Sequence, residues 1–321
     1  MNYSRIAGTG SYLPEKVLTN LDLEKMMDTS DQWIRERTGI ERRHIAASGE
    51  TTVDLAERAA RAALDAAGVR PTDVDFIAFG TTTPDMVFPN CGALLQARLG
   101  CRGAAAFSVE TACSGFMYAL SIADKFVRFG DARRALVIGA ETLSRITDWS
   151  DRSTAVLFAD GAGAVVLEAA QEPGVLSTHL HADGAYKDLL YCGGGLAANG
   201  DPAKSRRAIV MTGSEVFKIA VTTLGRAIDE ALAANSLERS AIDWLVPHQA
   251  NLRIIQATAR KLEMSMDRVI TTVQDHGNTS AASVPLALDV GVRDGRIKRG
   301  DLLLLEAFGG GVTWGSALIR Y

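Results

Sequence analysis

The stretch CSGFMYALSIADKFVRFGDARRALVIGAE (residues 113–141) is similar in pattern to a second stretch about 170 residues later, AASVPLALDVGVRDGRIKRGDLLLLEAF (residues 281–308). Each copy has the apolar spacing of a helix, then Gly-Asp, then a continuous apolar run that is typical of a buried strand. Gly130-Asp131 and Gly300-Asp301 occupy corresponding places. This internal repeat predicts two similar halves that are related by a pseudo-dyad.

Apolar runs alternate with helical patterns along the whole chain, which favours an α/β fold with mainly parallel strands. A helix is expected over residues 52–67, opened by Thr51 or Thr52 and closed by Gly68. YSRIAGTGSYLP (residues 3–14) is typical of a strand that enters a Gly-rich turn, and TAVLFADGAGAVVLEA (residues 154–169) of two strands around one. No linker separates the halves, so we expect residues 1–172 and 173–321 to share one body.

The composition excludes several classes of protein. The 321 residues are 47% hydrophobic and 22% charged, as in ordinary globular enzymes, and the net charge of −4 gives no reason to expect nucleic acid. Neither a signal peptide nor an apolar run long enough to span a membrane is evident. The four cysteines are irregularly spaced and form no CxxC pair, so neither a zinc ribbon nor a redox dithiol is indicated. We therefore expect a cytoplasmic protein.

Cys113 is the candidate nucleophile. It stands where the strand-like AAFSVET meets a helix, with small residues on both sides. The free N–H groups and the positive dipole end of a helix stabilise a thiolate. The alternative is a buried, inert thiol, and this is what we expect of Cys91, Cys101 and Cys192.

Three further features surround the same expected crevice. His248 ends the apolar run IDWLVPH just before a helix, and ligands bind at the carboxyl ends of such strands. Asn278 precedes the helix that mirrors the Cys113 helix, where it is either an N-cap or a side chain that points to the crevice. The glycines of AFGGGVTWG form either a hairpin turn or an oxyanion hole, or both.

The remaining motifs do not indicate a nucleotide or metal site. DGAGAVVLE lacks the third glycine of a dinucleotide fingerprint, and no phosphate-binding GxxxxGK[ST] loop occurs, so no nucleotide cofactor is expected. His179 and His181 alternate like strand neighbours, but no third ligand at a suitable spacing supports a metal site, and none is expected.

A Cys–His–Asn set admits two interpretations. A thiol protease uses the same residue types, but its cysteine lies near the mature N-terminus, whereas more than a hundred residues precede Cys113. The second is a condensing enzyme. From Ile6 to the C-terminus the chain resembles the β-ketoacyl-[acyl-carrier-protein] synthase III family. The motifs that carry the resemblance are, in chain order, TSDQWIRERTGIERRHI, ACSGF, DGAGAVVL, VPHQANLRII, GNTSAASVPLAL and AFGGGVTWGSAL.

The resemblance implies a thiolase-like fold: two βαβαβαββ halves, layered α-β-α-β-α, with the cysteine in the first half and the His and Asn in the second. It implies that Cys113 takes an acyl group from acyl-CoA as a thioester. His248 and Asn278 then stabilise the enolate that forms when malonyl thioester loses CO₂. The backbone N–H groups of Cys113 and Gly310 hold the oxyanion.

It also implies binding residues. For CoA and its pantetheine arm these are Trp33, Arg37, Arg152 and Asn251, with Trp33 and Arg152 on either side of the adenine. For the acyl pocket they are Met211, Phe217 and Phe88, the last reaching into the partner subunit. For the acidic carrier protein they are Lys218, Arg253, Arg260 and Lys261. A plain surface helix around Trp33 and a merely solvated face around Arg253 are the alternatives.

We therefore expect a homodimer that joins an acyl-CoA primer, with acetyl-CoA as the expected one, to malonyl-acyl-carrier protein. No metal or redox cofactor is expected. One alternative is a relative that uses a longer, branched or aromatic primer in secondary metabolism; another is a silent acyl-chain binder. Ser108 and Glu110 depart from the family pattern just before the nucleophile, and Glu110 is expected to point away from the sulfur.

Overall fold

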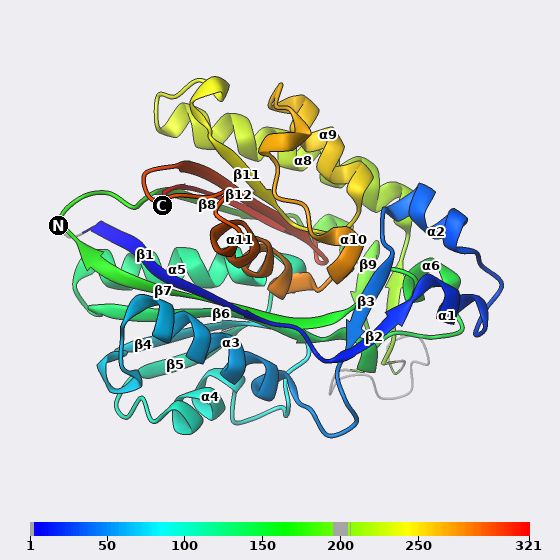
Figure 1. The fold of residues 1–321 in the computed structure, drawn as a ribbon, viewed down its shortest axis with the longest axis horizontal. Helices are drawn as coiled ribbons and strands as arrows, with labels where there is room; N and C mark the ends of the chain where they lie inside the picture. The colour runs from blue at the N-terminus through cyan, green and yellow to red at the C-terminus, as the bar shows by residue number, and fades with distance from the viewer. Residues whose placement is uncertain (1–2, 195–204, 206) are drawn as a thin grey trace.

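In the computed structural model, which describes residues 3–194, 205 and 207–321, the chain forms five layers (Figure 1). Two sheets lie one above the other, with α5 (Gly115–Phe129) and α11 (Ser283–Arg293) between them. Helices α3 (Thr52–Ala67) and α4 (Cys91–Leu99) cover the outer face of one sheet, and α8 (Gly213–Ala234) and α9 (Leu252–Lys261) cover the other. The predicted α-β-α-β-α layering is confirmed.

The two sheets have corresponding strand orders. The first is β5-β4-β6-β7-β1, made of Ala105–Val109, Phe76–Gly80, Arg134–Thr142, Asp160–Ala170 and Tyr3–Tyr12. The second is β11-β12-β13-β8, made of Trp244–Pro247, Leu302–Gly309, Thr313–Arg320 and Val175–Ala182. A single parallel bridge from Leu245 to Val269 stands in the place of β5. The predicted boundary at residues 172 and 173 falls between β7 and β8.

Smaller elements gather at one end of the molecule. They are β2 (Lys16–Thr19), α1 (Asn20–Glu24), α2 (Asp31–Thr38), β3 (Arg42–Ile45), α6 (Arg152–Ala155), β9 (Leu190–Cys192), β10 (Ile209–Met211) and α10 (Val273–His276). Figure 1 shows them opposite the end that carries the two chain termini.

The expected helix at α3 begins and ends as its sequence predicts. Thr51 caps the first turn through a reciprocal pair with Asp54, which satisfies free N–H groups. Gly68 ends the helix in the left-handed conformation, with φ at 63°. The apolar residues of α3 face β1, β6 and β7 as one buried stripe.

Three expectations about strands are wrong. The sheets are mixed, because β7 runs antiparallel to both β6 and β1. Residues 3–12 form one strand and not a strand with a turn: Gly8 and Gly10 are small because α3 packs on them, and a Cβ on Gly10 would lie 2.3 Å from the Ala63 nitrogen. Residues 160–169 belong to one strand, and α6 with a turn replaces the other.

Candidate active site

Cys113 lies in a short 3-10 turn, η2 (Ala112–Ser114), at the start of α5. Ala112 has φ at 46°, a strained value for a residue with a Cβ. The end of β12 in the other half packs directly against this turn: a Cβ on Gly309 would lie 2.7 Å from the Cys113 nitrogen. Cys113 is therefore positioned by both halves, and only 6% of the residue is exposed.

Two cavities meet at Cys113. The larger, of about 600 Å³, is also lined by His248 and Asn278, so all three predicted catalytic residues border one space. The smaller, of about 360 Å³, is lined by Cys113, by Gly310 and by both apolar and polar side chains. A substrate carbonyl at the junction would lie beside the sulfur, with one end of the substrate in each cavity.

His248 follows β11 and is buried, and burial lowers the pKa of its imidazole to about 4. The ring is therefore neutral at physiological pH. The Ser283 hydroxyl accepts the backbone N–H of Gln249 at 2.9 Å, which leaves its hydrogen free to donate to Nδ1 of His248 at 2.5 Å. This arrangement assigns the ring proton to Nε2, so that His248 is a neutral hydrogen-bond donor.

Asn278 borders the larger cavity and is not the N-cap of η7 (Ser280–Ala282), whose N-cap is Thr279. Its Oδ1 still accepts a backbone N–H, that of Ser280, at 2.9 Å. Its backbone pairs with Leu157 and Ala159, which ties it to the segment before β7. Because the oxygen is already engaged, the Nδ2 group is the part of the amide that remains to donate to a ligand.

Burial raises the pKa of the Cys113 thiol to about 12. A hydrogen bond with the Ser280 side chain lowers it, and the charge of Glu141, not that of Glu110, raises it. Glu110 is exposed, although it borders the smaller cavity. Sequence reasoning missed both Ser280 and Glu141. The signal for Glu141 was its place at the end of an apolar strand, the same signal that identified His248.

Trp33 and Arg37 share a face of α2, as their spacing predicts. The guanidinium groups of Arg37 and Arg152 each lie 4.8 Å from the centre of the Trp33 ring. A base stacked between Trp33 and Arg152 needs a separation of about 7 Å, twice the usual carbon–carbon contact distance. Arg152 must therefore move away from the ring before the predicted sandwich can form.

Asn251 borders the larger cavity, but both ends of its amide are used by the protein. Its Nδ2 group donates to the Arg37 carbonyl and its Oδ1 accepts the Arg253 N–H, both at 2.9 Å. It caps α9 and joins this helix to α2. These bonds hold two walls of the cavity together.

The residues predicted for the acyl pocket lie apart. Met211 and Phe217 line the larger cavity, together with Trp33 and Arg37. Phe88 lines neither cavity of the single chain, and 82% of it is exposed. Residues that do line the smaller cavity and that sequence reasoning missed are Leu143, Ile146, Phe158, Leu190 and Ile209. Several of them lie in short segments without a periodic pattern, so no sequence signal marked them.

The basic residues predicted for carrier docking form two groups. Lys218 and Arg253 line the mouth of the larger cavity, and Arg253 lies over the Phe217 ring at 5.5 Å. Arg260 and Lys261 lie in the last turn of α9, where Lys261 forms an ion pair of 3.0 Å with Asp229.

Other polar groups lie away from the site. His179 and His181 on β8 both contact Glu230 of α8.

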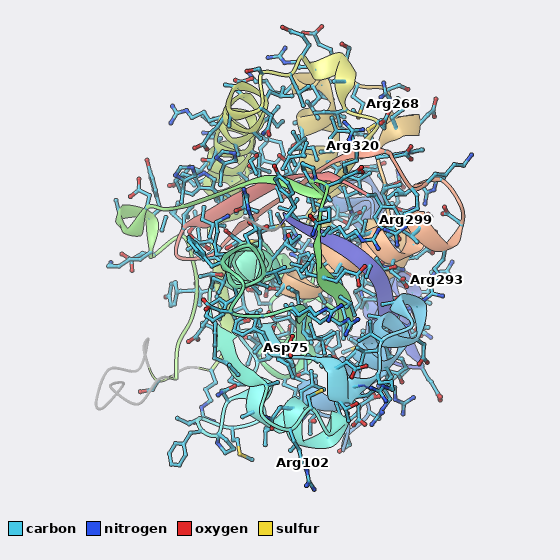
Figure 2. The ribbon with its side chains drawn as sticks, turned by 90° about the vertical axis from the view of Figure 1, so that its left-hand side faces the viewer. Asp75, Arg102, Arg268, Arg293, Arg299 and Arg320 are labelled. Carbon is cyan, nitrogen blue, oxygen red and sulfur yellow. The ribbon has the colours of Figure 1, made fainter. Side chains whose placement is uncertain are left out.

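Figure 2 views the end with the chain termini, where Arg268, Arg293, Arg299 and Arg320 stand at the surface. All four donate to backbone carbonyls: Arg293 and Arg299 to carbonyls within β1, and Arg268 and Arg320 to carbonyls just before β11 and β12. Within residues 3–194, 205 and 207–321, no helix is long and apolar enough to cross a membrane.

Comparisons with known proteins find relatives along the whole chain. Residues 107–184 match the family model of 3-oxoacyl-[acyl-carrier-protein (ACP)] synthase III, and residues 232–321 match the model of its C-terminal part. The chain is 62% identical over 322 residues to the β-ketoacyl-[acyl-carrier-protein] synthase III of Thioalkalivibrio sulfidiphilus, covering 100% of both chains. It is 64% identical over 319 residues to that of Xylella fastidiosa strain 9a5c, covering 99% and 98%.

Among solved structures, 3-oxoacyl-[acyl-carrier-protein] synthase III from Aquifex aeolicus superposes with a TM-score of 0.93 and 46% identity, covering 99% of this chain and 100% of that one. Fold, site and sequence lead to the same conclusion. This chain belongs to the β-ketoacyl-[acyl-carrier-protein] synthase III family.

Proposed function

We propose that Cys113 carries the acyl group in the reaction of this family, the decarboxylative condensation of an acyl-CoA primer with malonyl-acyl-carrier protein that begins fatty-acid synthesis. The observation that carries the proposal is the place of Cys113 at the junction of two cavities, one of which also holds His248 and Asn278. The thiol attacks the acyl-CoA carbonyl, CoA leaves, and the acyl chain stays on the sulfur. The resulting thioester is activated toward a carbon nucleophile.

His248 and Asn278 act in the second half of the reaction. Loss of CO₂ from the malonyl thioester places negative charge on its carbonyl oxygen. The Nε2–H of His248 and the Nδ2–H of Asn278 are neutral donors fixed by Ser283 and Ser280, so they stabilise this charge without reorganising. The enolate carbon then attacks the Cys113 thioester.

The larger cavity suits the CoA and pantetheine arm. Trp33 and Arg37 line it, and Arg152 lies over the Trp33 ring, so that a ring and two cations can bind an adenine and phosphates. The smaller cavity, with the oxyanion donors Cys113 and Gly310 at its edge, suits the acyl chain. We propose acetyl-CoA as the primer. Longer or branched acyl-CoA primers are the second candidate, because the volume of this cavity would also accommodate them.

An acidic carrier protein would dock at the mouth of the larger cavity. Lys218 and Arg253 are exposed there, directly beside the passage that a pantetheine arm would use. Arg260 and Lys261 extend the basic surface along α9, with Asp229 offsetting part of the Lys261 charge.

The homodimer is proposed from an unpaired edge. In the described chain β5 pairs only with β4, so its other edge is open to a second copy. Beside it, Met86, Val87 and Phe88 are 47%, 74% and 82% exposed, an arrangement that a partner subunit would cover. Phe88 would then reach the smaller cavity of the partner.

Neither a metal nor a redox cofactor enters this chemistry, because the thioester and the departing CO₂ supply the driving force. The CoA thioester is a substrate. The four cysteines are free thiols, which suits the reducing cytoplasm that we propose as the location.

Intact-protein mass spectrometry with a panel of acyl-CoAs tests the proposal. The wild type should gain the mass of one acyl group and Cys113→Ala should gain none, whereas Cys101→Ala, at a buried thiol outside both cavities, should acylate normally. The preferred acyl chain identifies the primer. Acylation of Cys113→Ala would assign the nucleophile to another residue.

A further inference from the structure

Arg43 of β3 is a fully buried cation whose partners are all neutral. Its Nη1 donates to the Leu18 carbonyl at 3.2 Å and to Oδ1 of Asn20 at 2.9 Å, and its Nη2 donates to the Val156 carbonyl at 2.9 Å. Its Nε is buried and has no partner among the described residues. Burial lowers the pKa of Arg43 to about 10, so the guanidinium group still carries its charge at physiological pH.

The guanidinium group of Arg43 joins three separate segments of the chain. A buried charge usually destabilises a fold relative to an apolar side chain of similar volume. A guanidinium group offers what an apolar side chain lacks, a rigid plane of donors that point in several directions. The three acceptors of Arg43 belong to β2, to α1 and to the turn that ends α6. Arg43 therefore fixes the distances between these segments.

One branch of this network leads to α2. The buried Asn20 accepts from Arg43 with its oxygen, and its Nδ2 group donates to Oδ1 of Asp31 and to the Ile40 carbonyl, both at 2.8 Å. Asp31 opens α2 and Ile40 follows its last turn, so Asn20 holds both ends of the helix. This helix carries the indole ring and the guanidinium group that line the larger cavity.

The other branch leads to Asn278. The backbone N–H of Asn278 donates at 2.9 Å to the carbonyl of Leu157, the residue after Val156. On the other side, Gly277 packs against the Arg43 side chain, because a Cβ on this glycine would lie 3.2 Å from the Arg43 Cβ. Both segments of this short pairing, the one at Leu157 and the one that carries Asn278, therefore rest on Arg43.

Resting on the proposed function of the larger cavity, we propose that Arg43 is a positioning residue that sets the place of α2 for binding acyl-CoA and the place of Asn278 for condensation. Arg43 lines neither cavity, so it acts only through the groups that it holds. A displacement of about 1 Å in a group that contacts the substrate can slow a reaction about 100-fold. One buried cation thus supports both steps of the reaction, each in a different way.

The helix α2 has other ties, so loss of the Arg43 bonds should displace it and not unfold it. Asn251 donates to the Arg37 carbonyl at 2.9 Å, and Arg152 donates to the Asp28 carbonyl, just before α2, at 2.8 Å. Neither of these bonds involves the segments at Leu157 and Asn278, so the second branch depends on Arg43 more than the first does.

The first test compares two acyl donors in Arg43→Lys, which retains the charge and replaces the planar donors with one ammonium group. With acetyl-CoA, the concentration for half-maximal acylation of Cys113 should rise about tenfold, while the maximal rate stays within about twofold of the wild type. With acetyl-pantetheine, which lacks the adenosine end that α2 would bind, neither quantity should change. An equal loss with both donors would contradict the role of Arg43 in placing α2.

The second test measures release of labelled CO₂ from malonyl-acyl-carrier protein. In Arg43→Lys the maximal rate should fall about 10- to 100-fold, because the donor group of Asn278 is displaced. Asn20→Ala breaks only the branch to α2, so it should raise the half-maximal concentration of acetyl-CoA and leave the maximal rate of CO₂ release unchanged. A normal maximal rate of CO₂ release in Arg43→Lys would overturn the branch to Asn278.

Arg268→Lys is the matched control. Arg268 also donates to two backbone carbonyls, those of Ile242 and Asp243, but at the end of the molecule with the chain termini (Figure 2). Its replacement should lower the melting temperature and leave acylation and CO₂ release as in the wild type. The same kinetic changes in Arg268→Lys as in Arg43→Lys would reduce the effect to general loosening and overturn the proposal.

Hydrogen exchange, followed by mass spectrometry, keeps this proposal distinct from the proposed function. The amides of α2 should exchange faster in Arg43→Lys and in Asn20→Ala than in the wild type, whereas those of α3 should not change. If the wild type takes no acyl group from either donor, the proposed function fails, and exchange in α2 still tests Arg43. Normal acylation together with unchanged exchange and kinetics in both variants would retain the function and reject the role of Arg43.

Discussion

The two halves of the molecule share a scaffold and differ in what it carries. Each half begins its central helix with a 3-10 turn whose first residue has positive φ, Ala112 at 46° and Ser280 at 49°. Each turn touches a strand glycine of the other half, Gly309 for the first and Gly139 for the second. The repeat therefore brings two equivalent turns together, and the chemistry depends on a few side chains.

Two buried glutamates on the equivalent strands β6 and β12 make the difference clear. Glu141 receives hydrogen bonds from three consecutive threonines, whereas both carboxylate oxygens of Glu306 lack a partner of good geometry among the described residues. Burial raises the pKa of Glu306 to about 8, and the Thr258 hydroxyl offsets this only slightly. Burial thus raises the pKa of both acids, and the hydrogen bonds that Glu141 receives offset part of the rise there.

Substitution of a glycine at the contact between the two halves should have the largest effect on stability. A Cβ on Gly139 would lie 2.1 Å from the Ala281 carbonyl oxygen, and both atoms belong to fixed backbone. Gly139→Ala should cost more than about 4 kcal/mol of unfolding free energy, measured by denaturant titration. Gly49→Ala, where nothing lies within 4 Å, is the control. A stable Gly139→Ala protein would mean that the halves are not tightly locked.

The division of labour between the halves predicts the next effect. His248→Ala should slow decarboxylation of malonyl-acyl-carrier protein about 10²- to 10³-fold, because a donor to the enolate oxygen is lost. Acylation of Cys113 should persist, since the thiol itself is intact. The assay compares release of labelled CO₂ with the acyl mass on the enzyme. Equal loss of both steps would contradict this division.

The raised pKa of Glu306 predicts that the stability of the folded protein depends on pH. Its folded pKa of about 8 lies above the ordinary 4.5, so the folded protein retains a proton that the unfolded chain loses. The wild type should therefore lose stability relative to Glu306→Gln as pH rises from about 4.5 to 8, by up to about 5 kcal/mol, and level off above. Denaturant titrations of both proteins at several pH values measure this. The exposed Glu15→Gln should show no such trend, and a pH-independent difference for Glu306→Gln would refute the buried neutral acid.

The smallest effect concerns the orientation of His248. Ser283→Ala removes the partner of Nδ1, so the proton is no longer confined to Nε2. Condensation should slow about tenfold, while acylation of Cys113 stays unchanged. Ser121→Ala removes a buried hydroxyl from the equivalent helix α5, where it bonds Thr178, and should leave both steps unchanged. If Ser283→Ala condenses normally, Ser283 does not set the tautomer.

Much of the site could be predicted because its residues are marked locally. Cys113 and Asn278 stand before helices and His248 follows an apolar strand, so each junction is visible in a few consecutive residues. The cap of α3 by Thr51 and Gly68 was visible for the same reason. Glu141 had a similar signal, but its meaning depends on Thr81–Thr83, almost sixty residues earlier.

The sequence by itself determined the repeat of the two halves, the order of most elements and the three side chains that meet at the cavities, because periodicity and strand–helix junctions are local properties. Only the tertiary structure decided that Gly8 and Gly10 continue a strand, that Met211 and Phe217 line the larger cavity, and that Thr81, Thr82 and Thr83 donate to Glu141. These facts depend on contacts between segments far apart in the chain. Close packing and the pairing of buried polar groups fix such contacts, and no local pattern encodes them.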